Sequence, residues 1–122
     1  MHMLLVEDDP IVRELLARLL SLSGQTVREA PGGVEALALL QSERFDAVVL
    51  DHLMPKMTGV QLLEKLRAMG VDIPIGFITA SRGHPDIENL RRRAVPVLFK
   101  PFTVPELKMF LDRLEESRLK VS

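Results

Sequence analysis

The segment 45–51, Phe-Asp-Ala-Val-Val-Leu-Asp, decides the fold class, because it combines a continuous apolar run with an acidic residue at its end. Apolar runs of this length are typical of strands that are covered on both faces, as in a parallel sheet. The segment 3–9, Met-Leu-Leu-Val-Glu-Asp-Asp, has the same form and ends in three acidic residues. Together they predict an α/β protein in which acidic residues follow buried strands.

Outward from these two segments, apolar strands alternate with amphipathic helices along the whole chain. We expect strands over residues 3–6, 26–30, 45–50, 74–78 and 95–99, and helices over residues 10–23, 34–42, 60–69, 86–93 and 103–117. The strand 26–30 is the most polar of the five, which favours a position at the edge of the sheet. This alternation predicts a doubly wound, five-stranded parallel sheet with helices on both faces.

The composition bounds the class of protein. A length of 122 residues argues for one domain, residues 1–122, and 47% hydrophobic with 27% charged residues is ordinary for a globular chain. Sixteen Lys and Arg against seventeen Asp and Glu argue against direct nucleic-acid binding. Cysteine is absent, and no apolar run approaches the ~18–20 residues of a membrane helix. We therefore expect a cytoplasmic domain with no membrane partner.

Ligand sites in doubly wound sheets lie outside the carboxyl ends of the strands. The residues expected there are Glu7, Asp8, Asp51, Thr79 and Lys100. Three carboxylates in one pocket repel each other, and a hard divalent cation such as Mg²⁺ relieves that repulsion with oxygen ligands. The sequence shows no cysteine and no histidine pair at ligand spacing, which disfavours zinc.

The two remaining strand-end residues suit phosphoryl chemistry. The Lys100 ammonium supplies positive charge and the Thr79 hydroxyl is a directional donor, so together they suit the oxygens of a phosphoryl group. In such a pocket the Asp51 carboxylate is a candidate nucleophile that forms an acyl phosphate. Asp9 precedes Pro10 and is interpreted as a helix N-cap.

Four segments of the chain resemble the receiver domains of response regulators in two-component phosphorelays: LLVEDDP (4–10), VVLDHLMPKMTG (48–59), FITA (77–80) and LFKPF (98–102). The resemblance covers nearly the whole chain in the family's order. It implies a flavodoxin-like strand order 2-1-3-4-5. It also implies that Asp51 accepts a phosphoryl group from the phosphohistidine of a histidine kinase or a histidine phosphotransfer domain.

The resemblance also implies roles for the other matched positions. It implies that Mg²⁺ is held by Glu7, Asp8, Asp51 and the backbone carbonyl of Leu53. Thr79 matches the switch hydroxyl, and Lys100 matches the lysine that pairs with the phosphate. Pro101 matches a proline whose preceding peptide bond is usually cis. Val97 stands where the family often has an aromatic residue that reports phosphorylation, so we expect no aromatic switch there.

Three hypotheses remain open at this point. The first is a phosphoacceptor domain of a response regulator or hybrid histidine kinase, which is not a turnover enzyme and acts on an output domain or a second copy. The second is an aspartyl-nucleophile phosphohydrolase, which typically has an acid two residues after the nucleophile, where this chain has Leu53. The third is a receiver that has lost its chemistry and serves in docking.

Several neighbouring residues have simpler interpretations. His52 is expected at the rim of the pocket, where it would tune access to Asp51. The run 91–93, three arginines, is expected to be a solvated helix face, with a partner-binding patch as the alternative. Met54 and Met57 are expected to pack the loop that follows the strand at 45–50.

Overall fold

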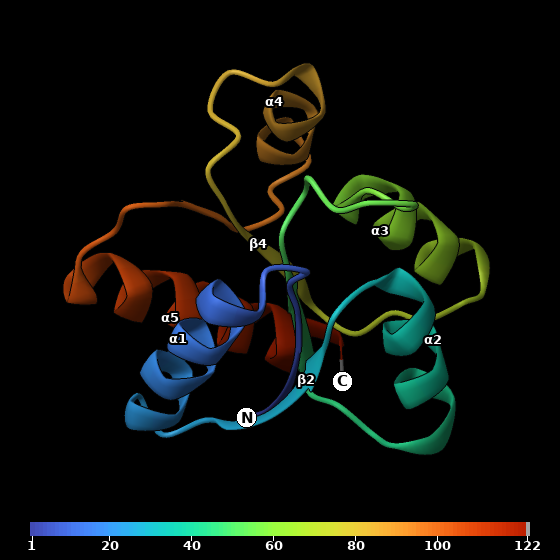
Figure 1. Ribbon diagram of the computed structural model, residues 1–122, viewed down its shortest axis with the longest axis horizontal. Helices are drawn as coiled ribbons and strands as arrows, with labels where there is room; N and C mark the ends of the chain where they lie inside the picture. Colours follow the sequence, from blue (N-terminus) through green and yellow to red (C-terminus); the bar gives the residue numbers. More distant parts are fainter. Residues whose placement is uncertain (122) are drawn as a thin grey trace.

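A five-stranded parallel sheet lies at the centre of the computed structural model, which describes residues 1–121 (Figure 1). The strands are β1 (His2–Val6), β2 (Thr26–Ala30), β3 (Ala47–Leu50), β4 (Ile75–Thr79) and β5 (Val97–Phe99). Their order across the sheet is β2-β1-β3-β4-β5, and every neighbouring pair is parallel. The predicted order and the edge position of residues 26–30 are therefore confirmed.

Five helices cover the two faces of this sheet, as Figure 1 shows. They are α1 (Pro10–Leu22), α2 (Gly33–Ser42), α3 (Gly59–Ala68), α4 (Pro85–Arg92) and α5 (Val104–Val121). Buried side chains of α2, α3 and α4 belong to one core cluster, and those of α1 and α5 belong to the other. The sheet is thus enclosed between two apolar layers, as predicted for a doubly wound fold.

The strand β1 shows why the sequence forms this sandwich. Leu4 and Val6 pack into the core beneath α2, α3 and α4, whereas Met3 and Leu5 pack into the core beneath α1 and α5. All four side chains are at most 1% exposed, because successive residues of a strand point to opposite faces and both faces are covered. The continuous apolar run is the direct consequence of this double burial.

Capping residues set the start of the helices that border the strand ends. The Asp9 carboxylate accepts hydrogen bonds from the backbone amides of Ile11 and Val12 at 2.9 and 3.2 Å, which confirms its role as the N-cap of α1. Thr103 and Glu106 form a reciprocal capping box at the start of α5. Both caps fix where the chain leaves the edge of the sheet that carries the site.

Three element boundaries differ by two residues or more from the sequence prediction, and β3 is one of them, because it begins at Ala47 and not at residue 45. The last strand begins at Val97 and not at residue 95, because the amide of Val95 donates to Leu90 O and so closes the end of α4. Pro96 has no amide hydrogen for the ladder, and only its carbonyl pairs, with the amide of Phe77. The last helix continues to Val121, beyond the predicted end at residue 117. Within residues 1–121, no helix is long and apolar enough to cross a lipid bilayer.

Candidate functional site

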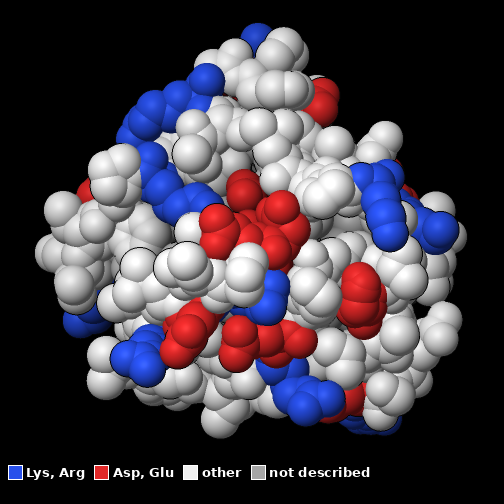
Figure 2. Space-filling view, viewed as in Figure 1, with Lys and Arg blue, Asp and Glu red and all other residues white. Residues whose placement is uncertain are grey.

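Three carboxylates meet where β1 and β3 end. These strands are neighbours in the sheet, and Val6 pairs with Leu50 in their register, so the residues that follow them lie side by side. One carboxylate oxygen from each of Glu7, Asp8 and Asp51 lies within 4.8 Å of the others. Figure 2 shows acidic side chains gathered at the centre of this face, with basic side chains along one side of them.

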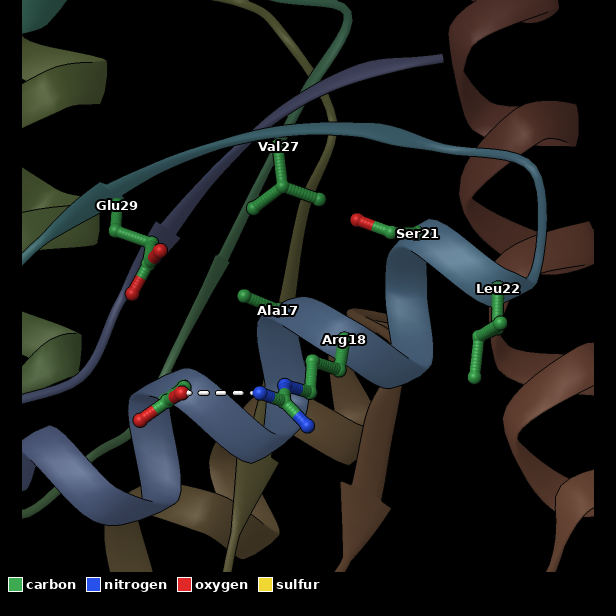
Figure 3. Close-up of a pocket in the computed structure, with 7 residues that line it drawn as sticks. Ala17, Arg18, Ser21, Leu22, Val27 and Glu29 are labelled. Atoms are coloured by element: carbon green, nitrogen blue, oxygen red, sulfur yellow. Dashed lines mark hydrogen bonds and ion pairs between the residues drawn. The ribbon is translucent and has the colours of Figure 1, made fainter.

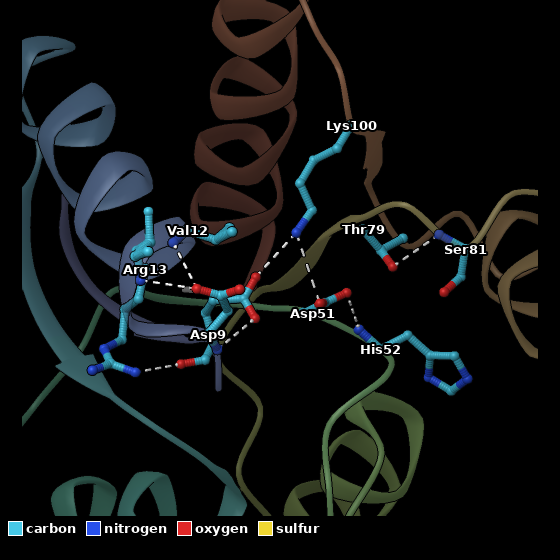
Figure 4. Close-up of polar contacts among 10 residues, drawn as sticks. Asp9, Val12, Arg13, Asp51, His52, Thr79, Ser81 and Lys100 are labelled. Atoms are coloured by element: carbon cyan, nitrogen blue, oxygen red, sulfur yellow. Dashed lines mark hydrogen bonds and ion pairs between the residues drawn. The ribbon is translucent and has the colours of Figure 1, made fainter.

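Lys100 reaches this acidic cluster from the end of β5. Its Nζ lies 3.0 Å from Glu7 Oε1, to which it donates a hydrogen bond, and 3.8 Å from Asp51 Oδ2 (Figure 4). The Glu7 side chain is buried, and this burial raises the pKa of its carboxyl above the ordinary value; the Lys100 hydrogen bond lowers it and the charge of Asp51 raises it further. One ammonium therefore pairs with two of the three carboxylates.

The Asp51 carboxylate is held by the backbone that follows it. The amide of His52 donates a 2.7 Å hydrogen bond to Asp51 Oδ1, while Oδ2 faces Lys100 (Figure 4). The fully buried Thr79 ends β4 on the same edge, and its hydroxyl oxygen accepts a 3.2 Å hydrogen bond from the amide of Ser81. The structure thus brings the predicted acids, lysine and hydroxyl to one edge of the sheet.

This donor set suits a hard divalent cation. Three carboxylates within one ion's reach, buried or half-buried, are the oxygen ligands that Mg²⁺ prefers, with water or phosphate oxygens completing the coordination. Burial raises the pKa of Glu7 more than the Lys100 hydrogen bond lowers it, and the charge of Asp51 adds to the increase, so the carboxylate form of Glu7 would gain from a nearby positive charge. The chemistry of these residues therefore fits a divalent cation.

His52 does not lie at the rim of this pocket, so that interpretation is wrong. Its side chain is 1% exposed and points away from the Asp51 carboxylate (Figure 4). The amide of Val60 donates to His52 Nδ1 at 3.4 Å, and the His52 ring lies edge-on to the ring of His84, with centroids 4.8 Å apart. The backbone turn after β3 therefore sends consecutive side chains to different places.

A second polar cluster forms on that side of the loop. One nitrogen of His52, one nitrogen of His84 and one carboxylate oxygen of Asp86 all lie within 4.8 Å of one another. Burial, and then the charge of His84, lower the pKa of His52 below its ordinary value. No histidine pair stands at ligand spacing in the sequence, because 32 positions separate the histidines 52 and 84, yet the fold brings these two side chains together.

The remaining predicted positions show a mixture of outcomes. The peptide bond between Lys100 and Pro101 is cis, and Val97 packs half-buried against the core. The Leu53 side chain is 58% exposed, and the metal-binding role of its carbonyl stays a prediction. Met54 and Met57 do pack on the core, as expected.

The arginine run 91–93 is exposed, as expected for a solvated helix face. Arg93 pairs with Glu64 at 2.7 Å, and Arg91 pairs with Glu88 at 3.5 Å. The guanidinium of Arg82 lies 4.4 Å from the centre of the Phe99 ring, and that of Arg91 lies 5.9 Å from it. Arg91 and Arg93, two of the three arginines in the run 91–93, therefore already have partners within the chain.

A groove between α1 and β2 is separate from the acidic cluster (Figure 3). It is lined by Glu14, Ala17, Arg18, Ser21, Leu22, Val27 and Glu29, none of which belongs to the predicted site. Arg18 and Glu14 lie 3.4 Å apart across one turn of α1. The groove offers a mixed apolar and charged surface and no cluster of catalytic groups.

Comparison with known sequences agrees with this geometry. A family model described as the response regulator receiver domain matches residues 3–112. Response regulator MprA of Mycobacterium ulcerans (strain Agy99) is 43% identical over 107 residues, 87% of this chain and 46% of MprA. MprA of Mycobacterium avium (strain 104) is 43% identical over 108 residues, 88% of this chain and 47% of MprA. The chain spans about half the length of these curated relatives.

Solved structures give the same result. The crystal structure of FixJ-N has a TM-score of 0.83 at 30% identity, covering 94% of this chain and 93% of that chain. Response regulator TrrA from Thermotoga maritima, in complex with Mg²⁺-BeF, has a TM-score of 0.81 at 32% identity, covering 93% and 97%.

A flavodoxin-like sheet with acids at the ends of β1 and β3 defines the class: a phosphoacceptor signalling domain. The chain belongs to the family of response regulator receiver domains, the phosphoacceptor modules of two-component signalling.

Proposed function

We propose that Asp51 is the phosphoacceptor of this chain and that a phosphohistidine is the donor. In this step a carboxylate oxygen of Asp51 forms a bond to phosphorus, the bond between phosphorus and the imidazole nitrogen breaks, and the nitrogen keeps the electron pair and takes up a proton. The observation that carries the proposal is the convergence of Glu7, Asp8 and Asp51 within 4.8 Å, with the Lys100 ammonium alongside.

The residues around Asp51 have complementary parts in this step. The amide of His52 and the ammonium of Lys100 fix the orientation of the Asp51 carboxylate at 2.7 and 3.8 Å, so little reorganisation is needed before attack. Glu7, Asp8, Asp51 and the Leu53 carbonyl would hold Mg²⁺. When bound, this ion neutralises negative charge that gathers between the phosphoryl oxygens and the carboxylates.

Phosphorylation would then change the surface near β4 and β5. A phosphoryl group adds charge and three acceptor oxygens, which attract the Thr79 hydroxyl and the Lys100 ammonium. Thr79 accepts from the amide of Ser81, so its movement would rearrange the start of the loop before α4. We propose that an output domain or a second copy of the chain responds to this change by binding the altered surface. The proposed donor, a histidine kinase or phosphotransfer domain, implies a cytoplasmic location.

The proposal is for a single self-phosphorylation and not for repeated turnover. The position two residues after Asp51 is Leu53, whose hydrocarbon side chain cannot transfer a proton to a leaving group. Sustained, Mg²⁺-dependent release of phosphate from a simple phosphate monoester would instead support a phosphohydrolase.

The test is exposure of the chain to phosphoramidate with and without Mg²⁺, followed by intact mass measurement. We expect wild type to gain the mass of one phosphoryl group only with Mg²⁺, and Asp51→Asn to gain none. Asp72→Asn, an exposed acid outside the cluster, is the matched control and should behave as wild type. An equal gain in Asp51→Asn would refute Asp51 as the acceptor.

A further inference from the structure

The second polar cluster contains a buried histidine nitrogen that lacks a hydrogen bond. His52 Nε2 is fully buried and has no hydrogen-bond partner among the described residues, although Asp86 Oδ2 lies 3.3 Å away. A buried polar atom without a partner costs free energy, so it calls for an explanation. The His52 side chain as a whole is 1% exposed, and Nε2 is aimed at the two surface residues of the cluster.

The distances in this cluster match those between ligands of one small ion. Zinc binds histidine nitrogen and carboxylate oxygen at about 2.0–2.2 Å in tetrahedral geometry, so two of its ligands lie roughly 3.3 Å apart. His52 Nε2 and Asp86 Oδ2 lie 3.3 Å apart, and His84 Nδ1 lies 3.9 Å from the same Asp86 oxygen. A small rotation of the half-buried His84 and the exposed Asp86 side chains would bring all three within reach of one ion.

We propose that His52, His84 and Asp86 form a binding site for Zn²⁺ or a similar transition-metal dication. The set of two imidazoles and one carboxylate, with a fourth position open to water, is typical of zinc and differs from the all-oxygen set of Glu7, Asp8 and Asp51. Chain topology brings the ligands together, because the loop after β3 supplies one histidine and the start of α4 supplies the other two ligands. The ion would tie these two segments to each other.

Two existing contacts would be exchanged on binding. Binding through His52 Nε2 moves the ring proton to Nδ1 and gives up the 3.4 Å contact with the amide of Val60, which is at the long limit for a hydrogen bond. His84 Nδ1, which accepts from the amide of Asp86 at 3.1 Å, would take the ion in place of that amide. The positive end of α4 opposes a cation, and the Asp86 and Glu88 carboxylates in its first turn offset this effect.

The test is calorimetric titration of the whole chain with Zn²⁺ in excess Mg²⁺. The excess Mg²⁺ competes with zinc at the acidic cluster, whose all-oxygen ligands suit magnesium. We expect one Zn²⁺ per chain in wild type. His84→Asn keeps a good N-cap for α4 but removes the imidazole, and Asp86→Asn removes the carboxylate. Each should weaken zinc binding at least about tenfold. Co²⁺ in place of zinc should give the strong visible absorption of a tetrahedral site in wild type and lose it in both variants.

Two controls separate this site from other ligands of the chain. His2→Asn removes a histidine at the start of β1 that pairs with Glu43, the residue after α2, and should leave zinc affinity unchanged. Asp8→Asn removes a ligand of the acidic cluster and should also leave it unchanged. The proposal is overturned if wild type binds no zinc, if His84→Asn binds as tightly as wild type, or if Asp8→Asn abolishes binding. Phosphorylation is not the readout, so failure here leaves the proposed function untouched.

Discussion

Asp51 and His52 are neighbours in sequence, yet their side chains belong to two different polar clusters. Asp51 joins Glu7 and Asp8 at the edge of the sheet, whereas His52 is buried against His84 and Asp86. Strand register builds the first cluster, because Val6 pairs with Leu50 and the acids follow directly. The second cluster instead depends on the conformation of the loop after β3 and on how α4 packs against the core. Strand register therefore predicts where the side chain of the first residue after β3 lies, but it does not predict the position of the second.

Substitution of Gly59 is expected to have the largest effect on stability, because this residue contacts the backbone of both Asp51 and His52. It begins α3, donates from its amide to His52 O at 2.7 Å, and is packed so closely that an added Cβ would lie 2.3 Å from Asp51 O. We expect Gly59→Ala to lower the free energy of unfolding by about 2–3 kcal/mol, because a backbone carbonyl cannot move aside. Urea unfolding followed by circular dichroism measures this loss.

Gly33→Ala is the matched control for this change. Gly33 also begins a helix, but its added Cβ would meet Met57 Sδ at 2.7 Å, the flexible part of a side chain. The loss of stability should therefore stay below about 1 kcal/mol. Equal losses in the two variants would show that the close approach of Gly59 to the Asp51 backbone is not what holds the loop.

The contrast between the clusters also explains what the sequence predicted and what it did not. The acidic cluster was predictable because parallel strands end at one edge, so Glu7, Asp8 and Asp51 needed only the strand assignments. Lys100 and Thr79 followed from the same rule. The polar character of residues 26–30 was enough to predict the edge position of β2, because an edge strand is less completely buried.

The second cluster was beyond sequence reasoning for a physical reason. No periodicity describes the turn after Asp51, and its conformation decides whether the His52 ring faces the pocket or α4. The position of His84 and Asp86 depends in turn on how α4 packs through Ile87 and Leu90. The early start expected for β5 failed in a similar way, because Val95 pairs with α4 and not with the sheet.

Asp9 sharpens the comparison within the acidic segment itself, with a smaller effect. It follows Asp8 but caps α1, so we expect Asp9→Ala to lower stability by about 1 kcal/mol. Asp9→Asn keeps a cap acceptor and should lose little. Both variants should keep the Mg²⁺ affinity of wild type within about threefold, since an exposed charge is well screened. A large loss of Mg²⁺ binding in Asp9→Asn would place Asp9 among the ligands instead.

The smallest change is expected from His52→Phe near pH 7.5, in the presence of a chelator. Phenylalanine has a similar shape and removes Nε2, which has no hydrogen bond, but it also removes the long 3.4 Å contact from the amide of Val60 to Nδ1, so the free energy of unfolding should change by less than about 1 kcal/mol. Phosphorylation by phosphoramidate should persist, because only the backbone amide of His52 contacts Asp51. A large loss of either property would show that the two clusters are not independent.

Acidification should separate wild type from this variant. The pKa of His52 is lowered in the fold, mainly by burial and then by the charge of His84, so folding favours the neutral ring. The contribution of His52 to stability is therefore complete above the ordinary value of 6.5 and is lost as the pH falls through the lowered folded value. Unfolding measured from pH 7.5 to pH 5 should show wild type losing stability relative to His52→Phe. Parallel curves for the two proteins would mean that Asp86 already compensates the charged imidazole, which would make the second cluster an ordinary ion pair.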